Sequence, residues 1–176
     1  MSKIDNKIKF ISINISLITI SDTRTLDDDS SGDLLNERIE KFGHKILIRK
    51  IIKDDVGEIK KTLTEIANND LIDVIITTGG TGLTGRDSTP DVVESISNKI
   101  ISGFGELFRQ LSYSKIGTST IQSRAIGAII QGKYIFSLPG STSACKDAWD
   151  DILQFQLDVR HKPCNFIELI PRLNEK

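Results

Sequence analysis

Cysteine and histidine are scarce in this sequence, and their spacing does not indicate a metal centre. The 176 residues include two cysteines, Cys145 and Cys164, and two histidines, His44 and His161. The cysteines form no CxxC pair, so we expect neither a zinc site nor a disulfide framework, and a cytoplasmic location fits best. We interpret Cys145 as a packing residue, and no spacing supports a histidine-dependent nucleophile.

An excess of one charge and a long apolar run are also missing. Lys plus Arg number 23 and Asp plus Glu 24, which leaves a formal net charge of −1. Because the basic residues are scattered without interleaved aromatics, we expect no nucleic-acid partner, and the balance gives no attraction to an anionic membrane. The most apolar early stretch, residues 8–20, is interrupted by polar residues and followed by SDTR. We therefore expect neither a membrane span nor a signal peptide.

Proline is rare, and all four prolines lie in the second half of the chain. The length suits one domain, and a hydrophobic content of 38% is enough for a core and argues against disorder. We expect a single domain over residues 1–176, of which residues 1–9 form a flexible N-terminal arm.

Hydrophobic periodicity in the first half predicts alternating strands and helices. Alternating isoleucines predict a strand over residues 11–20, and a helix with Ser30 or Ser31 as its N-cap runs to Gly43. A second strand over residues 46–52 is followed by a helix capped by Asp54 or Asp55. Residues 74–76 are an unbroken β-branched run, which is typical of a central parallel strand buried on both faces.

The second half continues the alternation. Pro90 predicts the first turn of a helix, and residues 106–111 have the spacing of another. We then expect two strands over residues 126–130 and 134–138, followed by a long closing helix over residues 142–160. Strands alternating with helices predict an α/β fold with right-handed crossovers and a mostly parallel central sheet.

Ligands of such sheets bind at the carboxyl ends of the strands, where the strand order reverses. The segment at residues 77–90, TTGGTGLTGRDSTP, follows the buried third strand and holds four glycines and six hydroxyl residues. Glycine-rich turns expose backbone N–H groups that bind anions, and the helix starting near Pro90 directs its positive end to the same place. A plain chain reversal needs fewer glycines, so we favour a phosphate-binding loop. The formal GxGxxG at residues 80–85 does not run directly into a helix, so it does not predict a dinucleotide site, and no Walker A lysine follows.

Asp87 is an unusual residue for a loop that binds phosphate. A carboxylate there could hold Mg²⁺ on a nucleotide, could form an ion pair with Arg86 or Arg24, or could add a cap to the following helix. Asp54 and Asp55 are either helix caps or part of the same metal site. The segment PGSTS at residues 139–143 is a second candidate anion site, or only a helix cap formed by Ser141.

Five segments, in this order, resemble the MoaB/MogA family of molybdenum cofactor biosynthesis proteins, most closely its MoaB branch, and the N-terminal domain of gephyrin. They are SDTR at 21–24, TTGGTG at 77–82, RDSTP at 86–90, GFGELFR at 103–109 and LPGS at 138–141. The resemblance extends over roughly residues 10–170. It implies a three-layer α/β/α sandwich that assembles as a homotrimer or homohexamer and acts with other cofactor-synthesis proteins.

The resemblance also implies a reaction: AMP is transferred from Mg-ATP to the terminal phosphate of molybdopterin before molybdate insertion. The family's catalytic, metal-holding aspartate falls on Asp87, and a second acidic position falls on Asp54, with Asp55 as the alternative. The implied substrate and phosphate contacts are Ser21, Asp22, Thr78, Gly79, Gly80, Thr81, Gly82, Ser88, Pro139, Gly140 and Ser141.

Two other functions stay open. Residues 139–142 read PGST, the MoaB-like form, where MogA and gephyrin-type sequences usually carry PGNP. The chain could therefore be a molybdopterin-binding carrier without turnover. A flavodoxin-like mononucleotide binder is the third alternative, and a yellow purified protein would favour it.

Overall fold

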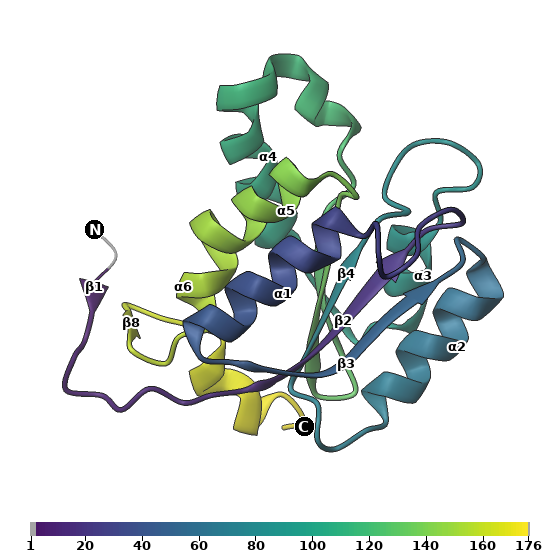
Figure 1. Cartoon of the computed structure of the whole chain (residues 1–176). Coiled ribbons are helices and arrows are strands. Elements are labelled where there is room, and N and C mark those ends of the chain that lie inside the picture. The colour runs from purple at the N-terminus through teal and green to yellow at the C-terminus, as the bar shows by residue number, and fades with distance from the viewer. Residues whose placement is uncertain (1–2, 176) are drawn as a thin grey trace.

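A six-stranded sheet forms the centre of the computed structural model, which describes residues 3–175 (Figure 1). The strand order is β3-β2-β4-β7-β6-β5. The strands are β2 (Asn14–Ile20), β3 (Lys45–Ile52), β4 (Val74–Thr78), β5 (Lys99–Ile101), β6 (Ile126–Ile130) and β7 (Lys133–Leu138). Neighbouring strands are parallel from β3 through β2 and β4 to β7. Strand β6 runs antiparallel to both of its neighbours, β7 and β5. The predicted mostly parallel sheet is confirmed.

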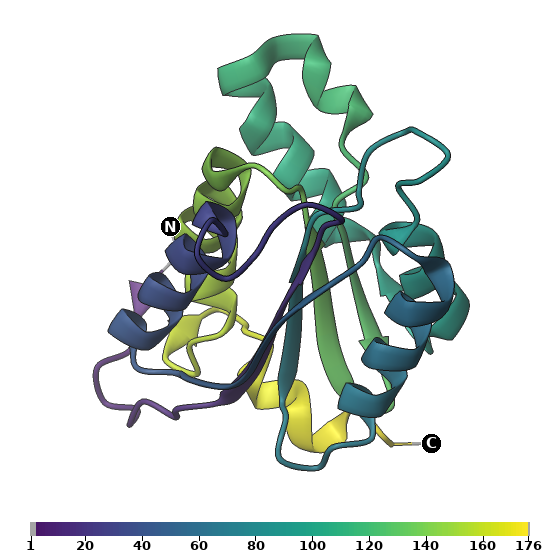
Figure 2. The same ribbon diagram turned by 45° about the vertical axis from the view of Figure 1, so that its right-hand side comes forward.

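Helices cover both faces of the sheet, as Figure 2 shows, and the predicted three-layer sandwich is confirmed. One face carries α1 (Ser30–Phe42), α4 (Ser102–Ile116) and α5 (Thr142–Ala148); the other carries α2 (Val56–Ala67) and α3 (Thr89–Ile96). The residues of β4 divide between these layers, since Ile76 packs into the first core and Ile75 into the second. Both are fully buried, as the β-branched run predicted.

The helix caps differ in part from the sequence-based expectation. The N-cap of α1 is Asp29, not Ser30 or Ser31, because its buried carboxylate accepts a hydrogen bond from the Gly32 amide at 3.0 Å. Asp55, not Asp54, caps α2 by accepting from the Glu58 amide at 2.8 Å, which leaves Asp54 free of that role.

Several boundaries were also wrong. The first long strand starts at Asn14, where pairing with Lys45 begins, and not at residue 11. The closing helix ends at Gln156, not at residue 160, because the chain turns back at Asp158, whose carbonyl accepts from the His161 amide. Between α5 and α6 (Gln154–Gln156) lies a π-helical turn, η2 (Trp149–Leu153), so the helix is also not uniform. The edge strand β5 was missed because three residues carry too little alternation to detect.

The N-terminal segment is partly ordered by pairing. Strand β1 (Lys3–Ile4) pairs antiparallel with β8 (His161–Lys162), and the short helix η3 (Ile167–Arg172) follows. Residues 1 and 2 of the expected arm lie outside the described residues, and the flexibility of residues 1–9 stays a prediction. In the described part of the chain, every helix is too short or too polar to span a bilayer.

Candidate active site

Four strand ends meet at one edge of the sheet, and the strand order reverses there between β2 and β4. The loops that follow β2, β3, β4 and β7 are tied together by main-chain hydrogen bonds. The Ser21 amide donates to the Ile52 carbonyl at 2.9 Å, and the Gly79 amide donates to the Leu138 carbonyl at 3.0 Å. These four loops are therefore neighbours, on the side of the molecule where the 79–88 loop projects (Figure 2).

Gly79 and Gly80 are required by close approach and by their backbone angles. Gly79 has φ +101°, and a Cβ there would lie 2.2 Å from the Ile20 carbonyl oxygen. Gly80 has φ +62°, and a Cβ there would lie 2.3 Å from the Thr89 hydroxyl. Gly140 packs against Gly79, with 3.3 Å between the position of its added Cβ and the Gly79 Cα. The glycines let the β4 loop lie against both neighbouring strand ends.

A cleft of about 450 Å³ opens over this loop. Its lining comes from the β4 loop, the β7 loop and the end of the 3₁₀ helix η1 (Gly117–Gln122): Gly79, Gly80, Thr81, Gly82, Asp87, Gln122, Ser123, Pro139, Gly140 and Ser141. The Gly79 amide is occupied by Leu138, but within residues 3–175 no acceptor is bonded to the amides of Gly80 and Thr81. These two amides can therefore bind an anion in the cleft.

Asp87 lies in the cleft as an ionised group held by its own loop. One carboxylate oxygen accepts from the Thr84 amide at 2.9 Å and from the Thr84 hydroxyl at 2.5 Å. The Thr84 hydroxyl lowers the pKa of Asp87 most, burial opposes it, and the amides of Thr84 and Gly82 add to the lowering. The alternative of an ion pair with Arg86 or Arg24 was wrong, because Arg86 pairs with Asp22 and Arg24 with Asp29.

Asp54 lies beside Asp87 in a different electrostatic environment. Burial raises the pKa of Asp54 most, and the negative charge of Asp87 raises it further. The Ser88 hydroxyl donates to Asp54 at 3.5 Å, and the Asp54 amide donates to Asp22 at 3.3 Å. Thus Asp22, Asp54, Asp87 and Ser88 lie together at this edge, and the carboxylates of Asp87 and Asp22 both repel that of Asp54.

The acidic side chains of the described residues do not form a complete cation cage at this edge. Within residues 3–175 no group of three or more His, Cys, Asp or Glu side chains has the geometry to hold a metal ion. Mg²⁺ commonly takes one or two carboxylates and completes its shell with substrate phosphates and water. Burial raises the pKa of Asp54 most, and the negative charge of Asp87 raises it further. A bound cation would neutralise this charge, so the carboxylates of Asp54 and Asp87 suit Mg²⁺ as ligands.

The other predicted site residues serve the protein itself to different degrees. Thr78 is fully buried, and its hydroxyl donates to the Pro139 carbonyl at 3.0 Å and lies 3.1 Å from the Cys145 sulfur, so this side chain joins β4 to β7. The Ser21 hydroxyl oxygen accepts from the Arg24 amide at 3.2 Å within its own turn. Ser141 caps α5 by accepting from the Ala144 amide at 3.3 Å. The helix-cap interpretation of Ser141 is confirmed, while Gly140 lines the cleft.

Cys145 has no chemical role available at this site. It is fully buried, and burial raises the pKa of its thiol to about 11. The thiolate is therefore not populated at neutral pH, which agrees with the packing role that the sequence indicated.

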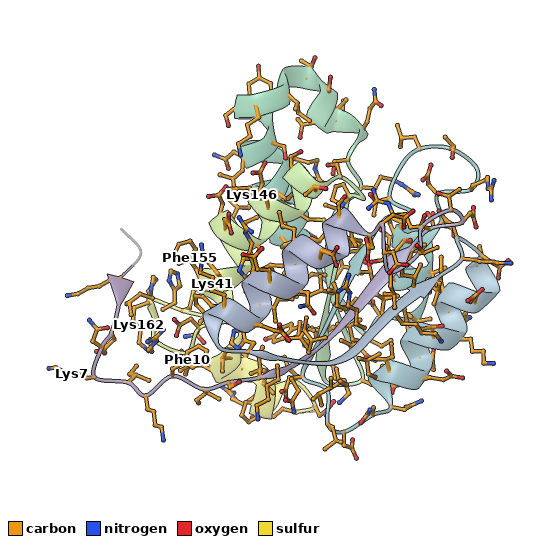
Figure 3. All side chains as sticks on the ribbon, in the orientation of Figure 1. Lys7, Phe10, Lys41, Lys146, Phe155 and Lys162 are labelled. Carbon is orange, nitrogen blue, oxygen red and sulfur yellow. The ribbon has the colours of Figure 1, made fainter. Side chains whose placement is uncertain are left out.

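The sequence interpretation missed Gln122, Ser123, Thr84 and Arg124. Arg124, just before β6, donates from Nε to the Gly82 carbonyl at 2.9 Å. The four lysines labelled in Figure 3, Lys7, Lys41, Lys146 and Lys162, lie left of the centre of the view, whereas the 79–88 loop projects at its right. A Ser-Arg pair directly before a predicted strand was the only available signal, and it is weak.

An Asp54→Asn variant is expected to be more stable than the wild type at neutral pH. The folded state raises the pKa of Asp54, so its charged form opposes folding above that pKa. Asparagine removes the charge, and the gain is about 0.5 kcal/mol because solvent screens a partly exposed group. The gain is lost as the pH falls through the raised pKa of the folded state toward about 4, below which the aspartate is neutral in both states. Urea unfolding at several pH values measures it.

Asp55→Asn is the matched control. It removes the same charge from the neighbouring residue, which is exposed and caps α2. Asparagine caps as well as aspartate, so we expect no gain in stability. An equal gain in both variants would show that overall charge, not the position of Asp54, is responsible.

Comparison with known proteins gives a consistent result. Residues 16–159 match the family described as "Probable molybdopterin binding domain". The chain is 40% identical over 158 residues to the molybdenum cofactor biosynthesis protein B of Escherichia coli K12, covering 90% of this chain and 93% of that one. The protein of the same name from Bacillus cereus is 43% identical over 142 residues, or 80% and 84% of the two chains.

Solved structures agree in fold. The crystal structure of a molybdenum cofactor biosynthesis protein B superposes with a TM-score of 0.85 at 38% identity, covering 94% of this chain and 98% of that one. The tungsten cofactor synthesizing protein MoaB from Pyrococcus furiosus gives a TM-score of 0.72 at 36% identity, covering 80% and 90%.

Proposed function

Because the chain belongs to the molybdopterin-binding family of molybdenum cofactor biosynthesis proteins, we propose that it binds molybdopterin and transfers AMP from Mg-ATP to the terminal phosphate of that pterin. The observation that carries the proposal is one juxtaposition. Gly80 and Thr81, whose amides have no acceptor among residues 3–175, line a cleft that Asp87 also lines, and Asp54 lies next to that carboxylate.

The transfer needs binding and charge control more than covalent help from the protein. An oxygen of the pterin phosphate attacks the α-phosphorus of ATP, the bond from that phosphorus to the β-phosphate oxygen breaks, and pyrophosphate leaves. Amides at the Gly80–Thr81 turn bind phosphate oxygens and orient them, and Gly140 leaves room for a ligand opposite. Mg²⁺, when bound with the nucleotide, would neutralise phosphate charge, and Asp54 and Asp87 are the residues that would hold it.

A specific observation also supports a carrier without turnover as the second candidate. The Asp87 carboxylate is already satisfied by Thr84 and by the Gly82 amide. The described residues also offer no complete cation site before a nucleotide arrives. A protein that only holds the pterin would need the amides of the loop. It would need neither the release of Asp87 from Thr84 nor the completion of a cation site.

The deciding experiment is incubation of the purified protein with molybdopterin and Mg-ATP, followed by mass analysis of the pterin. Adenylylated molybdopterin that disappears when Mg²⁺ is left out supports the transferase. Bound but unmodified pterin supports the carrier. Absence of both binding and product would contradict both candidates.

We also propose a cytoplasmic homotrimer or homohexamer that acts with other cofactor-synthesis proteins. Exposed apolar side chains on α4 and η1 support contact between copies, with Tyr113 59% and Ile121 81% exposed. Analytical ultracentrifugation should then give three or six times the 19.5 kDa chain mass. A monomer at micromolar concentration would contradict this.

A further inference from the structure

Arg124 lies outside the candidate phosphate loop but is hydrogen-bonded to it at two points. It stands between η1 and β6, and its guanidinium donates to three different partners. Nε donates to the Gly82 carbonyl at 2.9 Å, Nη2 donates to the Asp87 carbonyl, and Nη1 donates to both carboxylate oxygens of Asp91 at 3.0 and 2.9 Å.

Two of these partners, Gly82 and Asp87, mark the ends of one exposed segment. Residues 83–86 lie between Gly82 and Asp87 and are exposed, with Leu83 65% exposed. Inside the segment, the Asp87 amide donates to the Thr84 carbonyl at 3.1 Å, and the Thr84 amide donates to the Asp87 carboxylate at 2.9 Å. Arg124 adds a bond to each end of the segment from outside it, through the Gly82 and Asp87 carbonyls, and so restrains the separation of the two ends.

The same two residues carry chemistry. Asp87 supplies the carboxylate of the cleft, and the Gly82 amide helps to stabilise its charge. Ser123, next in sequence to Arg124, also lines the cleft. A shift of the guanidinium would thus move the acidic side of the cleft relative to its η1 wall.

We propose that Arg124 is a positioning residue that sets the location of Asp87 and Gly82 for the reaction, an inference that rests on the proposed AMP transfer. It acts through the two main-chain carbonyls and does not touch the substrates. Lysine carries its three N–H donors on one nitrogen and cannot reach the three separated partners of the planar guanidinium, so charge alone does not replace the arginine.

The competing explanation is a structural ion pair between Arg124 and Asp91 that anchors α3. An Asp91→Asn variant separates the two, because it removes the charge pairing and leaves both carbonyl bonds in place. Arg109→Gln is the matched control for loss of an arginine. The Arg109 guanidinium bonds at 3.4 Å to the carbonyls of Ser123 and Ala125, which flank Arg124, and has no hydrogen bond to the loop.

The experiment compares Arg124→Gln, Arg124→Lys, Asp91→Asn and Arg109→Gln by two readouts. The first, amide hydrogen exchange of residues 82–88, needs no ligand. The second is the separation of kcat from KM for ATP. For both Arg124 variants we expect the Asp87 amide to lose protection and kcat to fall by roughly 10- to 100-fold, with a smaller change in KM, since small misplacements of a reacting group have effects of this size. The two controls should stay within about threefold of the wild type in kcat and keep the protection.

Three results would overturn the proposal: an Arg124→Gln variant with unchanged exchange and kcat, full rescue by lysine, or an equal loss in Asp91→Asn or Arg109→Gln. If Arg124→Gln does not fold, Arg124→Lys, which keeps the charge and the aliphatic stem, supplies the test. A wild-type protein that transfers no AMP contradicts the proposed function alone, and the exchange experiment then decides the positioning role by itself.

Discussion

Replacement of Asp87 by asparagine is expected to remove AMP transfer and to leave molybdopterin binding in place. The amide keeps an oxygen that can accept from the Thr84 amide and hydroxyl, so the loop retains its shape. What is lost is a negative charge whose low pKa keeps it ionised in the wild type. Loss of one such electrostatic group lowers kcat by about 10²–10³-fold. Initial rates of product formation, with pterin binding measured by calorimetry, check both parts.

Asp27→Asn is a suitable control for the Asp87 variant. Asp27 is an exposed carboxylate in the loop after β2, with no hydrogen bond or ion pair among the described residues. Its replacement makes the same change in net charge and should leave both transfer and binding unchanged. Full activity of the Asp87→Asn protein would remove Asp87 from the mechanism, and loss of pterin binding would assign it to ligand recognition instead.

A Gly79→Ala variant is expected to show the largest loss of stability. Its methyl carbon would stand 2.2 Å from the Ile20 carbonyl oxygen, a main-chain atom that cannot rotate away. The backbone at φ +101° is also unfavourable for alanine. We expect the free energy of unfolding to fall by more than about 2 kcal/mol, because β2 and β4 must separate at their carboxyl ends. Urea unfolding followed by circular dichroism measures the change.

Gly85→Ala provides the comparison within the same loop. Gly85 has no positive φ, and nothing lies within 4 Å of the Cβ that alanine would add. This variant should stay within about 0.5 kcal/mol of the wild type. Equal losses at the two positions would show that the close approach of Gly79 to Ile20 is not what makes Gly79→Ala unstable. An unchanged Gly79→Ala protein would show that β2 and β4 do not approach as closely as described.

Much of the fold was predictable because the hydrophobic pattern specifies which faces are buried. The run at Val74–Ile76 indicated a doubly covered strand, and all three residues are fully buried. Gly43 ends α1 with φ 109°, as its place after Phe42 predicted. Features set by tertiary contacts were not predictable in this way. Asp29 caps α1 because the Thr19 hydroxyl on β2 donates to its carboxylate at 2.6 Å, and no local pattern reveals that neighbour.

The candidate site divides along the same line. The glycines and acids of the loop could be identified from its composition. The rule that ligands bind at strand ends also predicted that Asp54 lies near Asp87, although more than thirty positions separate them. Which polar atoms remain free could not be predicted. Thr78 has the same residue type as Thr81 in the same motif, yet its hydroxyl is directed to Pro139 because β7 lies alongside β4. Arg124 comes from a distant segment whose approach depends on η1.

The most direct test of the central claim is an amide NMR titration of ¹⁵N-labelled protein with molybdopterin. The account predicts the largest chemical-shift changes at Gly80, Thr81 and Gly140, with Gly132 at the far end of β7 unchanged. Molybdopterin that binds without altering the Gly80 and Thr81 amides would contradict the claim that these two groups hold the phosphorylated pterin.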